Sequence, residues 1–345
     1  MEAAFVERLG PPSEIRLGLL PRPTPGPTDV LVRVELTTVN PVDTLVRSGA
    51  LVTPVPLPLV LGRDAVGTVA EAGEGTGFTV GEPVWTNSLG HDGRQGAAAQ
   101  YAVVPADRLY RLPTGVDPTA AVTVLHPGAT AWLALFRHGR LRAGETVVVL
   151  GAAGNVGGAA VAFAAEAGAR VLAVARAADA EHCRALGAAE VLDRRDPALT
   201  GALTRAAPAG VALLVDAAGR NDLAWAVELL APRGRLVLLA GAATGPDAAP
   251  ALPVGAFYQK DLTVRGFVIS RAGVEELAAA ATAVNRLLAA GRLASRRTTT
   301  RPLSAIVDEH RRLEDGTAHG RRVALRTSAA LHPVRGHPAR TQGRG

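Results

Sequence analysis

Apolar and polar positions follow two different periods along the chain. Residues 29–36 alternate apolar and polar side chains, as a strand with one buried face does. Residues 146–150 and 170–175 are instead short valine-rich apolar runs, which is typical of strands buried on both faces. Between them, an apolar helical segment covers about residues 158–167 and ends at Gly168. These elements predict a βαβ unit.

Strand and helix patterns go on alternating after this unit. Helices are predicted at 179–186, 199–206 and 222–230, and strands at 190–192, 211–215 and 235–240. Residues 262–269 predict a further strand of the same sheet, residues 274–290 a long helix, and residues 320–325 a closing strand. This alternation favours a parallel, doubly wound α/β sheet.

The first 120 residues are β-rich. LGRDAVGTVAEAG at 61–73 has the glycine spacing that suits the bends and close backbone approaches of a small, partly open barrel. Residues 99–104 predict another strand. From Asp117 the period becomes helical, and we expect HPGATAW at 126–132 to interrupt the helix briefly.

Composition narrows the class of protein. The 345 residues suffice for two domains, and 48% of them are hydrophobic. No apolar run has the length of a membrane span and MEAAFVERLG does not form a signal peptide, so we expect a cytoplasmic protein without membrane contact. Cys183 is the one cysteine, which excludes internal disulfides and a thiolate zinc cluster. The net charge of +6 comes from scattered arginines that form no cluster with aromatic residues, so we expect no nucleic acid partner.

A glycine turn, GAAGNVG at 151–157, joins the first buried strand to its helix. A side chain at Gly151 or Gly154 would keep the backbone away from a dinucleotide's diphosphate, and Gly157 would let the helix lie close to the strand. The helix N-terminus would offer free N–H groups to the anion. The spacing is GxxGxxG instead of GxGxxG, so a tight turn of an ordinary α/β domain remains the alternative. We assign these residues of the turn to a dinucleotide site: Gly151, Ala153, Gly154, Asn155, Val156 and Gly157.

Seven segments together carry a more specific pattern. They are VNPVDTLVRSG at 39–49, LGRDAVGTVAEAGEG at 61–75, YAVVPAD at 101–107, PGATAW at 127–132, LRAGETVVVLGAAGNVG at 141–157, CRALGA at 183–188 and KDLTVRGFV at 260–268. From about residue 2 to residue 326 the chain resembles the zinc-free quinone reductases, the zeta-crystallin-like group of the medium-chain dehydrogenase/reductase superfamily.

The resemblance implies a Rossmann doubly wound parallel-sheet domain and a GroES-like, β-rich, partly open barrel domain. The implied division is a first catalytic part at 1–120, an NADPH-binding domain at 121–265 and a return to the catalytic domain at 266–326. The composition of residues 327–345, rich in Pro, Gly, Arg and His, predicts a disordered tail. It also implies a homodimer, paired through an edge strand at 262–268.

The resemblance bears on metal content. Zinc-dependent relatives have a cysteine where this chain has Asn40 and a histidine where it has Arg63, and an arginine cannot coordinate zinc. His91, His126 and His138 show no ligand spacing, and we expect them at the surface or in turns. We predict no metal.

The cofactor is expected to be NADPH. The strand at 170–175 leads into Arg176, where an NAD-preferring protein would carry Asp or Glu, and a guanidinium can bind the 2′-phosphate bidentately. Family members usually hold this phosphate with a lysine and a tyrosine, at the places of Asp179 and Arg194 here, so Arg194 is a second candidate. The alternative is that both arginines are solvated surface charges. We also assign Ala240 and Phe267 to the cofactor site.

The resemblance places three polar side chains near the nicotinamide. Asn40 could donate a hydrogen bond to a substrate oxygen or position the carboxamide. Thr130 could bind the nicotinamide amide or supply a hydroxyl. Asp43 could orient its neighbours or relay a proton, or could simply cap the short helix that follows. Arg47 could attract an anionic substrate or lie exposed.

Two leucines change the expected pocket. Leu45 and Leu51 stand where the family often has tyrosines, which would leave an apolar wall without a proton donor. This favours hydride delivery to a hydrophobic small molecule, a quinone or similar conjugated carbonyl. The alternatives are an enoyl or alkenal reductase of the same fold and, in another class, a non-catalytic NADPH-binding structural or sensory protein.

Overall fold

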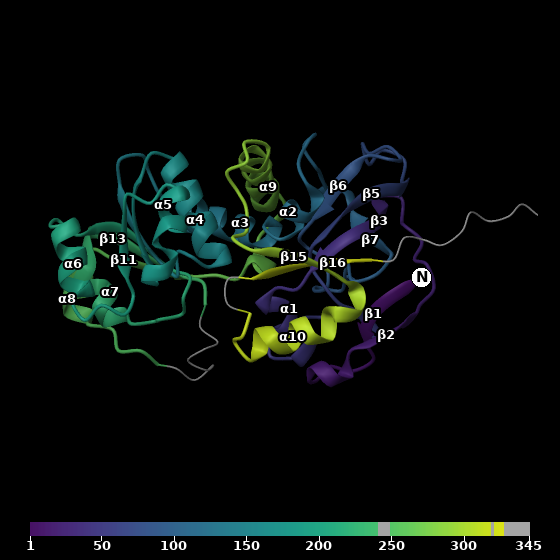
Figure 1. The fold of residues 1–345 in the computed structure, drawn as a ribbon, viewed down its shortest axis with the longest axis horizontal. Coiled ribbons are helices and arrows are strands. Elements are labelled where there is room, and N and C mark those ends of the chain that lie inside the picture. The colour runs from purple at the N-terminus through teal and green to yellow at the C-terminus, as the bar shows by residue number, and fades with distance from the viewer. Residues whose placement is uncertain (241–248, 319–320, 328–345) are drawn as a thin grey trace, which may run out of the picture.

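The computed structural model describes residues 1–240, 249–318 and 321–327. Figure 1 shows two halves side by side, a half built on a parallel sheet and a β-rich half, with helices α3 and α9 where they meet. Among the described residues no helix is both long and apolar enough to cross a membrane.

One half contains a six-stranded, fully parallel sheet. Its strands in spatial order are β11 (Glu190–Asp193), β10 (Arg170–Ala175), β9 (Thr146–Leu150), β12 (Val211–Asp216), β13 (Leu230–Leu238) and β14 (Thr263–Gly266). Strand order reverses beside β9, because β10 and β11 lie on one side of it and β12 to β14 on the other. The carboxyl ends of the strands at such a reversal form a crevice in which ligands bind.

Helices cover both faces of this sheet because successive strand residues point to opposite sides. Val147 and Val149 pack with α3, α4 and α9, whereas Val148 and Leu150 pack with α6 and α7. The α-helices of the described residues are α1 (Pro41–Ser48), α2 (Pro118–Val122), α3 (Leu125–Trp132) with a π-helical turn at Leu133–His138, α4 (Asn155–Glu166), α5 (Ala180–Ala185), α6 (Leu199–Ala206), α7 (Leu223–Leu229), α8 (Val254–Gln259), α9 (Val274–Ala289) and α10 (Ile306–Glu314).

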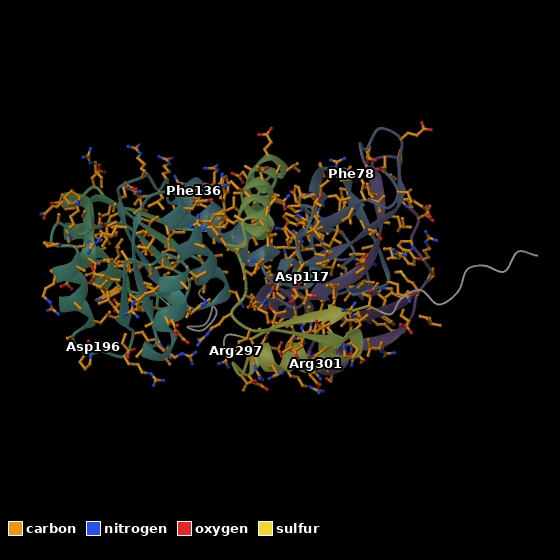
Figure 2. The ribbon with its side chains drawn as sticks, turned by 45° about the horizontal axis from the view of Figure 1, so that its top comes forward. Phe78, Asp117, Phe136, Asp196, Arg297 and Arg301 are labelled. Carbon is orange, nitrogen blue, oxygen red and sulfur yellow. The ribbon has the colours of Figure 1, made fainter. Side chains whose placement is uncertain are left out.

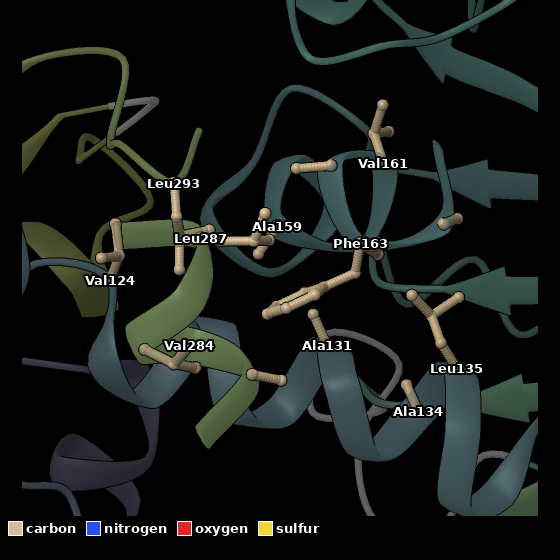
Figure 3. Close-up of a cluster of buried hydrophobic side chains, with 14 of the residues drawn as sticks. Val124, Ala131, Ala134, Leu135, Ala159, Val161, Phe163, Val284, Leu287 and Leu293 are labelled. Carbon is tan, nitrogen blue, oxygen red and sulfur yellow. The ribbon is translucent and has the colours of Figure 1, made fainter. Parts of the chain in front are cut away.

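Packing of α3, α4 and α9 joins the two halves. Figure 3 shows the ring of Phe163 (α4) directed toward Ala131 (α3), with Leu287 of α9 beside it. The same apolar cluster includes Trp85 from the β-rich half, whose Nε1 donates to Oδ1 of Asn285 at 2.9 Å. The helix that carries the glycine turn is therefore held by residues from both halves.

The β-rich half contains two sheets. The larger one has the order β15 (Thr298–Pro302), β16 (Arg322–Arg326), β3 (Asp29–Thr38), β5 (Ala65–Ala72), β6 (Pro83–Thr86) and β8 (Tyr110–Arg111), and β7 (Tyr101–Pro105) also pairs with β3. The smaller one is β2 (Arg16–Leu19), β1 (Glu2–Val6) and β4 (Leu59–Val60). Strand β16 pairs with β3 across almost the whole length of the chain, through Ala324 and Thr38.

Two expectations from the sequence are wrong. The helix does not break over residues 126–132, because Pro127 is the third residue of α3, where the missing N–H would have no partner within the helix. Of the tail expected to be disordered, Thr327 is buried and its N–H donates to the Glu35 carbonyl at 3.2 Å. The rest of that tail and Gly320 of the expected closing strand lie outside the described residues.

Candidate functional site

The glycine turn lies at the carboxyl end of β9, beside the strand-order reversal. Gly151 has a φ of +72°, and a Cβ there would lie 3.3 Å from the Cβ of Ala218. A Cβ on Gly157 would lie only 2.1 Å from the Gly151 carbonyl oxygen. Gly157 thus lets α4 pack against the turn, while Gly154 is exposed at the N-terminus of α4. The N–H groups of the first turn of α4 are available to an anion.

A segment of the β-rich half faces this turn. Ala153, Gly154 and Asn155 line one side of a narrow hollow. Ser295 and Arg296, between α9 and β15, line another side. The Ser295 hydroxyl is buried and has no hydrogen-bond partner in the part of the chain that the structure describes. Bare backbone, helix N–H groups and a hydroxyl without a partner among the described residues thus lie together, and these are groups that can bind an anion. Val156 and Gly157 belong to the same turn but do not line this hollow.

Arg176, directly after β10, belongs to a three-residue ion-pair group. Its Nε donates to Oδ2 of Asp179 at 2.8 Å, and the Arg296 guanidinium binds Oδ1 of the same carboxylate. The Asp179 side chain is buried, whereas that of Arg176 is 44% exposed. Two arginines thus share one carboxylate and leave a net positive charge at the end of β10. The sequence analysis missed Arg296 because only the tertiary fold brings it to the glycine turn.

Arg194 is the second predicted phosphate ligand. Ala175 pairs with Asp193 in register, so Arg176 and Arg194 follow adjacent parallel strands at the same level. The Arg194 N–H donates to the Ala175 carbonyl at 2.7 Å, and its side chain is exposed and makes no ion pair with any described residue. The two arginines therefore lie side by side at the crevice.

The other two residues assigned to the cofactor follow the next strands of the sheet. Ala240 lies just after β13 and is exposed, and its carbonyl oxygen lies 3.2 Å from where a Cβ of Gly219 would be. Phe267 directly follows β14, but its ring stacks on that of His138, with centroids 4.1 Å apart. The Phe267 ring thus packs within the protein, against the cluster between α3 and α9.

The side chains of Asn40 and Asp43 make hydrogen bonds to other residues of the protein. The Asn40 N–H donates to Oδ2 of Asp43 at 2.6 Å, so Asp43 caps α1, which is the alternative left open above. Asn40 is 1% exposed; its Nδ2 donates to Oδ2 of Asp64 at 2.9 Å, and Nη2 of Arg322 donates to its Oδ1 at 2.8 Å. Both residues therefore belong to a buried polar cluster at the start of α1.

This cluster contains two carboxylates and two guanidiniums, all buried: Asp43, Asp64, Arg63 and Arg322. Nε of Arg63 lies 3.8 Å from Oδ1 of Asp43. Burial raises the pKa of Asp43, against the charge of Arg63, and raises the pKa of Asp64 to about 7. Burial also lowers the pKa of both arginines. Arg63 Nε and Nη2 and Asp64 Oδ1 have no hydrogen-bond partner among the described residues.

Zinc does not fit this donor set. The Arg63 guanidinium offers no lone pair, and the Asn40 amide already bonds Asp64 and Arg322. Within the described part of the chain, no group of three or more His, Cys, Asp or Glu side chains could hold a metal ion.

The remaining predicted residues are one threonine and two leucines. Thr130 is half-buried on α3, and its hydroxyl donates to the His126 carbonyl at 2.8 Å, so only its oxygen lone pairs remain free to accept. The Leu51 N–H donates to the Leu45 carbonyl at 3.0 Å, and both side chains are partly buried. Leu51 packs against the core that contains Val46.

Two further expectations are corrected by the structure. Arg47 neither lies exposed nor can meet a substrate, because its guanidinium is fully buried and bonds Glu314 and the Gly10 carbonyl. His126 lies inside α3 and is buried, and burial lowers its pKa well below the ordinary value.

Comparison with known proteins agrees with this architecture. The Alcohol dehydrogenase GroES-like domain family matches residues 26–114, and the Zinc-binding dehydrogenase family matches residues 155–286. The quinone oxidoreductase of Sus scrofa is 31% identical over 243 residues, which are 69% of this chain and 73% of that protein.

Two solved structures superpose on nearly the whole chain. An NAD-dependent alcohol dehydrogenase gives a TM-score of 0.83 at 28% identity, covering 95% of this chain and 100% of its own. A mycobacterial protein complexed with NADPH gives 0.80 at 28% identity, covering 94% and 99%. The expected Rossmann and GroES-like combination and the resemblance read from the sequence are confirmed. The protein is an oxidoreductase enzyme of the quinone oxidoreductase-like family, in the medium-chain dehydrogenase/reductase superfamily.

Proposed function

We propose that this enzyme transfers hydride from NADPH to a quinone or a similar hydrophobic conjugated carbonyl, without zinc. The observation that carries the cofactor assignment is the pair of arginines, Arg176 and Arg194, that follow adjacent strands at the ribose edge. Among the described residues, Asp179 supplies the one carboxylate bonded to Arg176, and Arg296 also neutralises it. Such an edge favours a 2′-phosphate over a bare ribose diol.

Binding of this cofactor would use residues from both halves. The N–H groups of Asn155 and Val156 would bind the diphosphate, and Ser295 and Arg296 would close the opposite side. The Gly154 N–H already donates to the Gly151 carbonyl at 2.8 Å, so Gly154 would contribute its bare backbone and not a donor. Arg176 and Arg194 would bind the 2′-phosphate. When bound, the cofactor supplies the hydride, so the protein has to orient the reactants and stabilise the negative charge that develops on oxygen.

The substrate side is the second part of the proposal. Leu45 and Leu51 offer no hydroxyl, which supports an apolar substrate. The buried cluster at the start of α1 sets the arginines Arg63 and Arg322 against two carboxyl groups, which supports a site that needs no metal to balance those carboxyl groups. Thr130 would accept a hydrogen bond from the nicotinamide amide.

The decisive experiment is a turnover assay with a panel of quinones and conjugated enones. NADPH oxidation, followed by its absorbance, should depend on the acceptor and should exceed NADH oxidation by about ten- to a hundredfold in kcat/KM. Product analysis distinguishes a reduced quinone from a saturated carbonyl, which would indicate an enoyl or alkenal reductase. Cofactor binding without consumption by any acceptor would indicate a binding protein and contradict the proposal.

We also propose that the enzyme is a homodimer. Strand β14 ends the six-stranded sheet, so one edge of it is free to pair. Val254 and Tyr258 on α8, which precedes this strand, are 64% and 69% exposed, as apolar residues of an interface would be in a single chain. Sedimentation at several concentrations tests this; a monomer at all concentrations would contradict it.

The division of the chain at residues 120, 265 and 326 remains a proposal of the same kind. It is supported by the strands of the parallel sheet, which fall between residues 146 and 266. Limited proteolysis with mass spectrometry of the fragments tests it, because the expected cuts lie near these positions.

A further inference from the structure

A second hollow lies at the opposite edge of the parallel sheet from the glycine turn. The glycine turn follows the carboxyl end of β9, whereas this hollow is lined by the connection before β9 and by the amino ends of β13 and β14. Its volume is about 530 Å³, which is within the range of small-molecule sites. It is therefore separate from the cofactor crevice.

Arginine dominates its lining. Arg140, Arg142, Arg233, Arg235 and Arg265 line it, and we call this site the basic hollow. Arg235 binds both carboxylate oxygens of Glu145, with Nη1–Oε1 and Nη2–Oε2 distances of 2.9 and 2.6 Å.

The other four arginines have no such partner. They make no ion pair with any residue in the described ranges. Because Glu145 already neutralises Arg235, Asp261 is the one carboxylate of the lining left to oppose them, and it too makes no ion pair there. Within the described ranges of one chain, the basic hollow thus presents four guanidiniums without an ion-pair partner against a single carboxylate. One of them, Arg265, lies on β14, the strand proposed above to pair in the homodimer, so the test below uses the other residues.

The backbone of the basic hollow is also unusual. Within the described ranges five non-glycine residues have a positive φ, and three of them line this site: Arg140 at +48°, Arg233 at +62° and Asp261 at +53°. Glycine adopts this conformation without the steric cost that a Cβ brings, and the chain has 38 glycines. Arginine nevertheless occupies two of these positions. Strained backbone of this kind gathers at ligand sites.

We propose that the basic hollow binds a small oligophosphate, either inorganic or as the phosphate chain of a nucleotide. Guanidinium groups bind phosphate oxygens through pairs of parallel hydrogen bonds, so several arginines around one cavity suit a ligand with several phosphates. Arg235, fixed by Glu145, forms the rigid wall of the site. This site is independent of the cofactor and of the hydride acceptor.

Calorimetric titration with inorganic tripolyphosphate tests the proposal. The full chain is titrated with NADPH in excess, so that the cofactor crevice is occupied, and at about physiological ionic strength, where weak surface attraction is screened. One molecule should bind per chain. Arg140→Gly combined with Arg233→Gly should weaken binding at least about tenfold, and the protein should stay folded because glycine tolerates both backbone conformations.

A variant that binds tripolyphosphate more tightly shows that charge recognition, and not damage to the fold, changes the affinity. Asp261→Asn removes the opposing carboxylate, keeps its shape and suits the left-handed backbone, so it should lower Kd about threefold or more. Arg205→Ala is the matched control, because it removes an exposed arginine on α6 outside the basic hollow; its Kd should equal that of the unmodified protein.

Three results would overturn the proposal: no binding heat, an unchanged Kd in the double glycine variant, or an equal loss in Arg205→Ala. Titration with ATP under the same conditions identifies the source of the ligand. Tighter binding of ATP than of tripolyphosphate assigns the site to a nucleotide, and the reverse assigns it to inorganic phosphate chains. Either outcome supports the shared oligophosphate chemistry.

Discussion

Arg176 donates a hydrogen bond from its Nε to Oδ2 of Asp179 at 2.8 Å, directly after strand β10. The buried Asp179 carboxylate fixes the guanidinium of a side chain that is 44% exposed. The Nη1 and Nη2 groups of Arg176 make no bond to a described residue, so they can still donate to a ligand. The Asp179 carboxylate thus fixes the position of Arg176.

Arg176→Ala should therefore raise the KM for NADPH by about ten- to a hundredfold, the equivalent of one charge-assisted hydrogen bond. The KM for NADH should stay nearly constant, because NADH has no 2′-phosphate. Steady-state kinetics with both cofactors measures the two effects. Arg184→Ala, on α5 and outside the ion-pair group, is the control. An equal rise for NADH would rule out a phosphate contact.

The close approach at the glycine turn predicts a difference between neighbouring glycines. Gly157→Ala would place a Cβ 2.1 Å from the Gly151 carbonyl oxygen, and should cost about 1–3 kcal/mol of the free energy of unfolding. Gly158→Ala brings a Cβ no nearer than 3.3 Å, to the end of the Leu186 side chain, and should be tolerated. Urea unfolding of both variants makes the comparison. Similar losses would show that the helix packing is not the cause.

Arg47 should matter for stability and not for substrate affinity. Arg47→Met leaves the Glu314 carboxylate and the Gly10 carbonyl without their partner and should cost about 1–3 kcal/mol. The KM for the acceptor should not change, since the guanidinium is fully buried. Urea unfolding and acceptor kinetics are measured on the same sample. Arg286→Met, which removes the exposed partner of Glu166, should change neither quantity measurably.

Asp64 should make stability depend on pH. Burial raises its pKa from 3.8 to about 7, so the folded protein binds a proton that the unfolded chain releases between these values. The contribution of Asp64 is therefore fully present below pH 3.8 and is lost as pH rises through 7. Asp64→Asn lacks this loss.

Thermal unfolding at a series of pH values tests this assignment. Relative to Asp64→Asn, the unmodified protein should become less stable from about pH 4 to pH 7, by at most about 1.4 kcal/mol per pH unit. Parallel curves for the two proteins would show that Asp64 does not titrate in this range.

Strands and helices whose structure is decided by one local sequence pattern could be predicted. Residues 146–150 and 170–175 are strands because a strand buried on both faces needs an unbroken apolar run. Helix α6 coincides with the predicted residues 199–206 because its apolar side chains recur at helical spacing. The helix break expected at residues 126–132 was wrong, because proline breaks the interior of a helix but is accepted in its first turn, where Pro127 lies.

Elements that are stabilised by contacts with distant parts of the chain could not be predicted from their own sequence. Strands β1, β2 and β15 were not predicted, and β15 reads TTTRP, with no residue fully buried. Helix α10 carries mostly charged residues and was also missed. For the site, the glycine turn and Arg176 could be predicted from adjacent residues. Arg296 and Arg322 could not, because each reaches its carboxylate or amide across more than a hundred residues of chain.

Because β16 pairs with β3, the larger sheet of the β-rich half can be completed only at the end of synthesis. Thr38 leaves the ribosome early, yet its strand neighbour Ala324 is made only after the whole parallel-sheet half. Until then one margin of β3 exposes unsatisfied backbone groups that another nascent chain could capture. If translation paused or stopped before residue 322, the parallel sheet could still assemble, but β3 would lack its partner β16. Aggregation during expression should therefore start at the unpaired edge of β3.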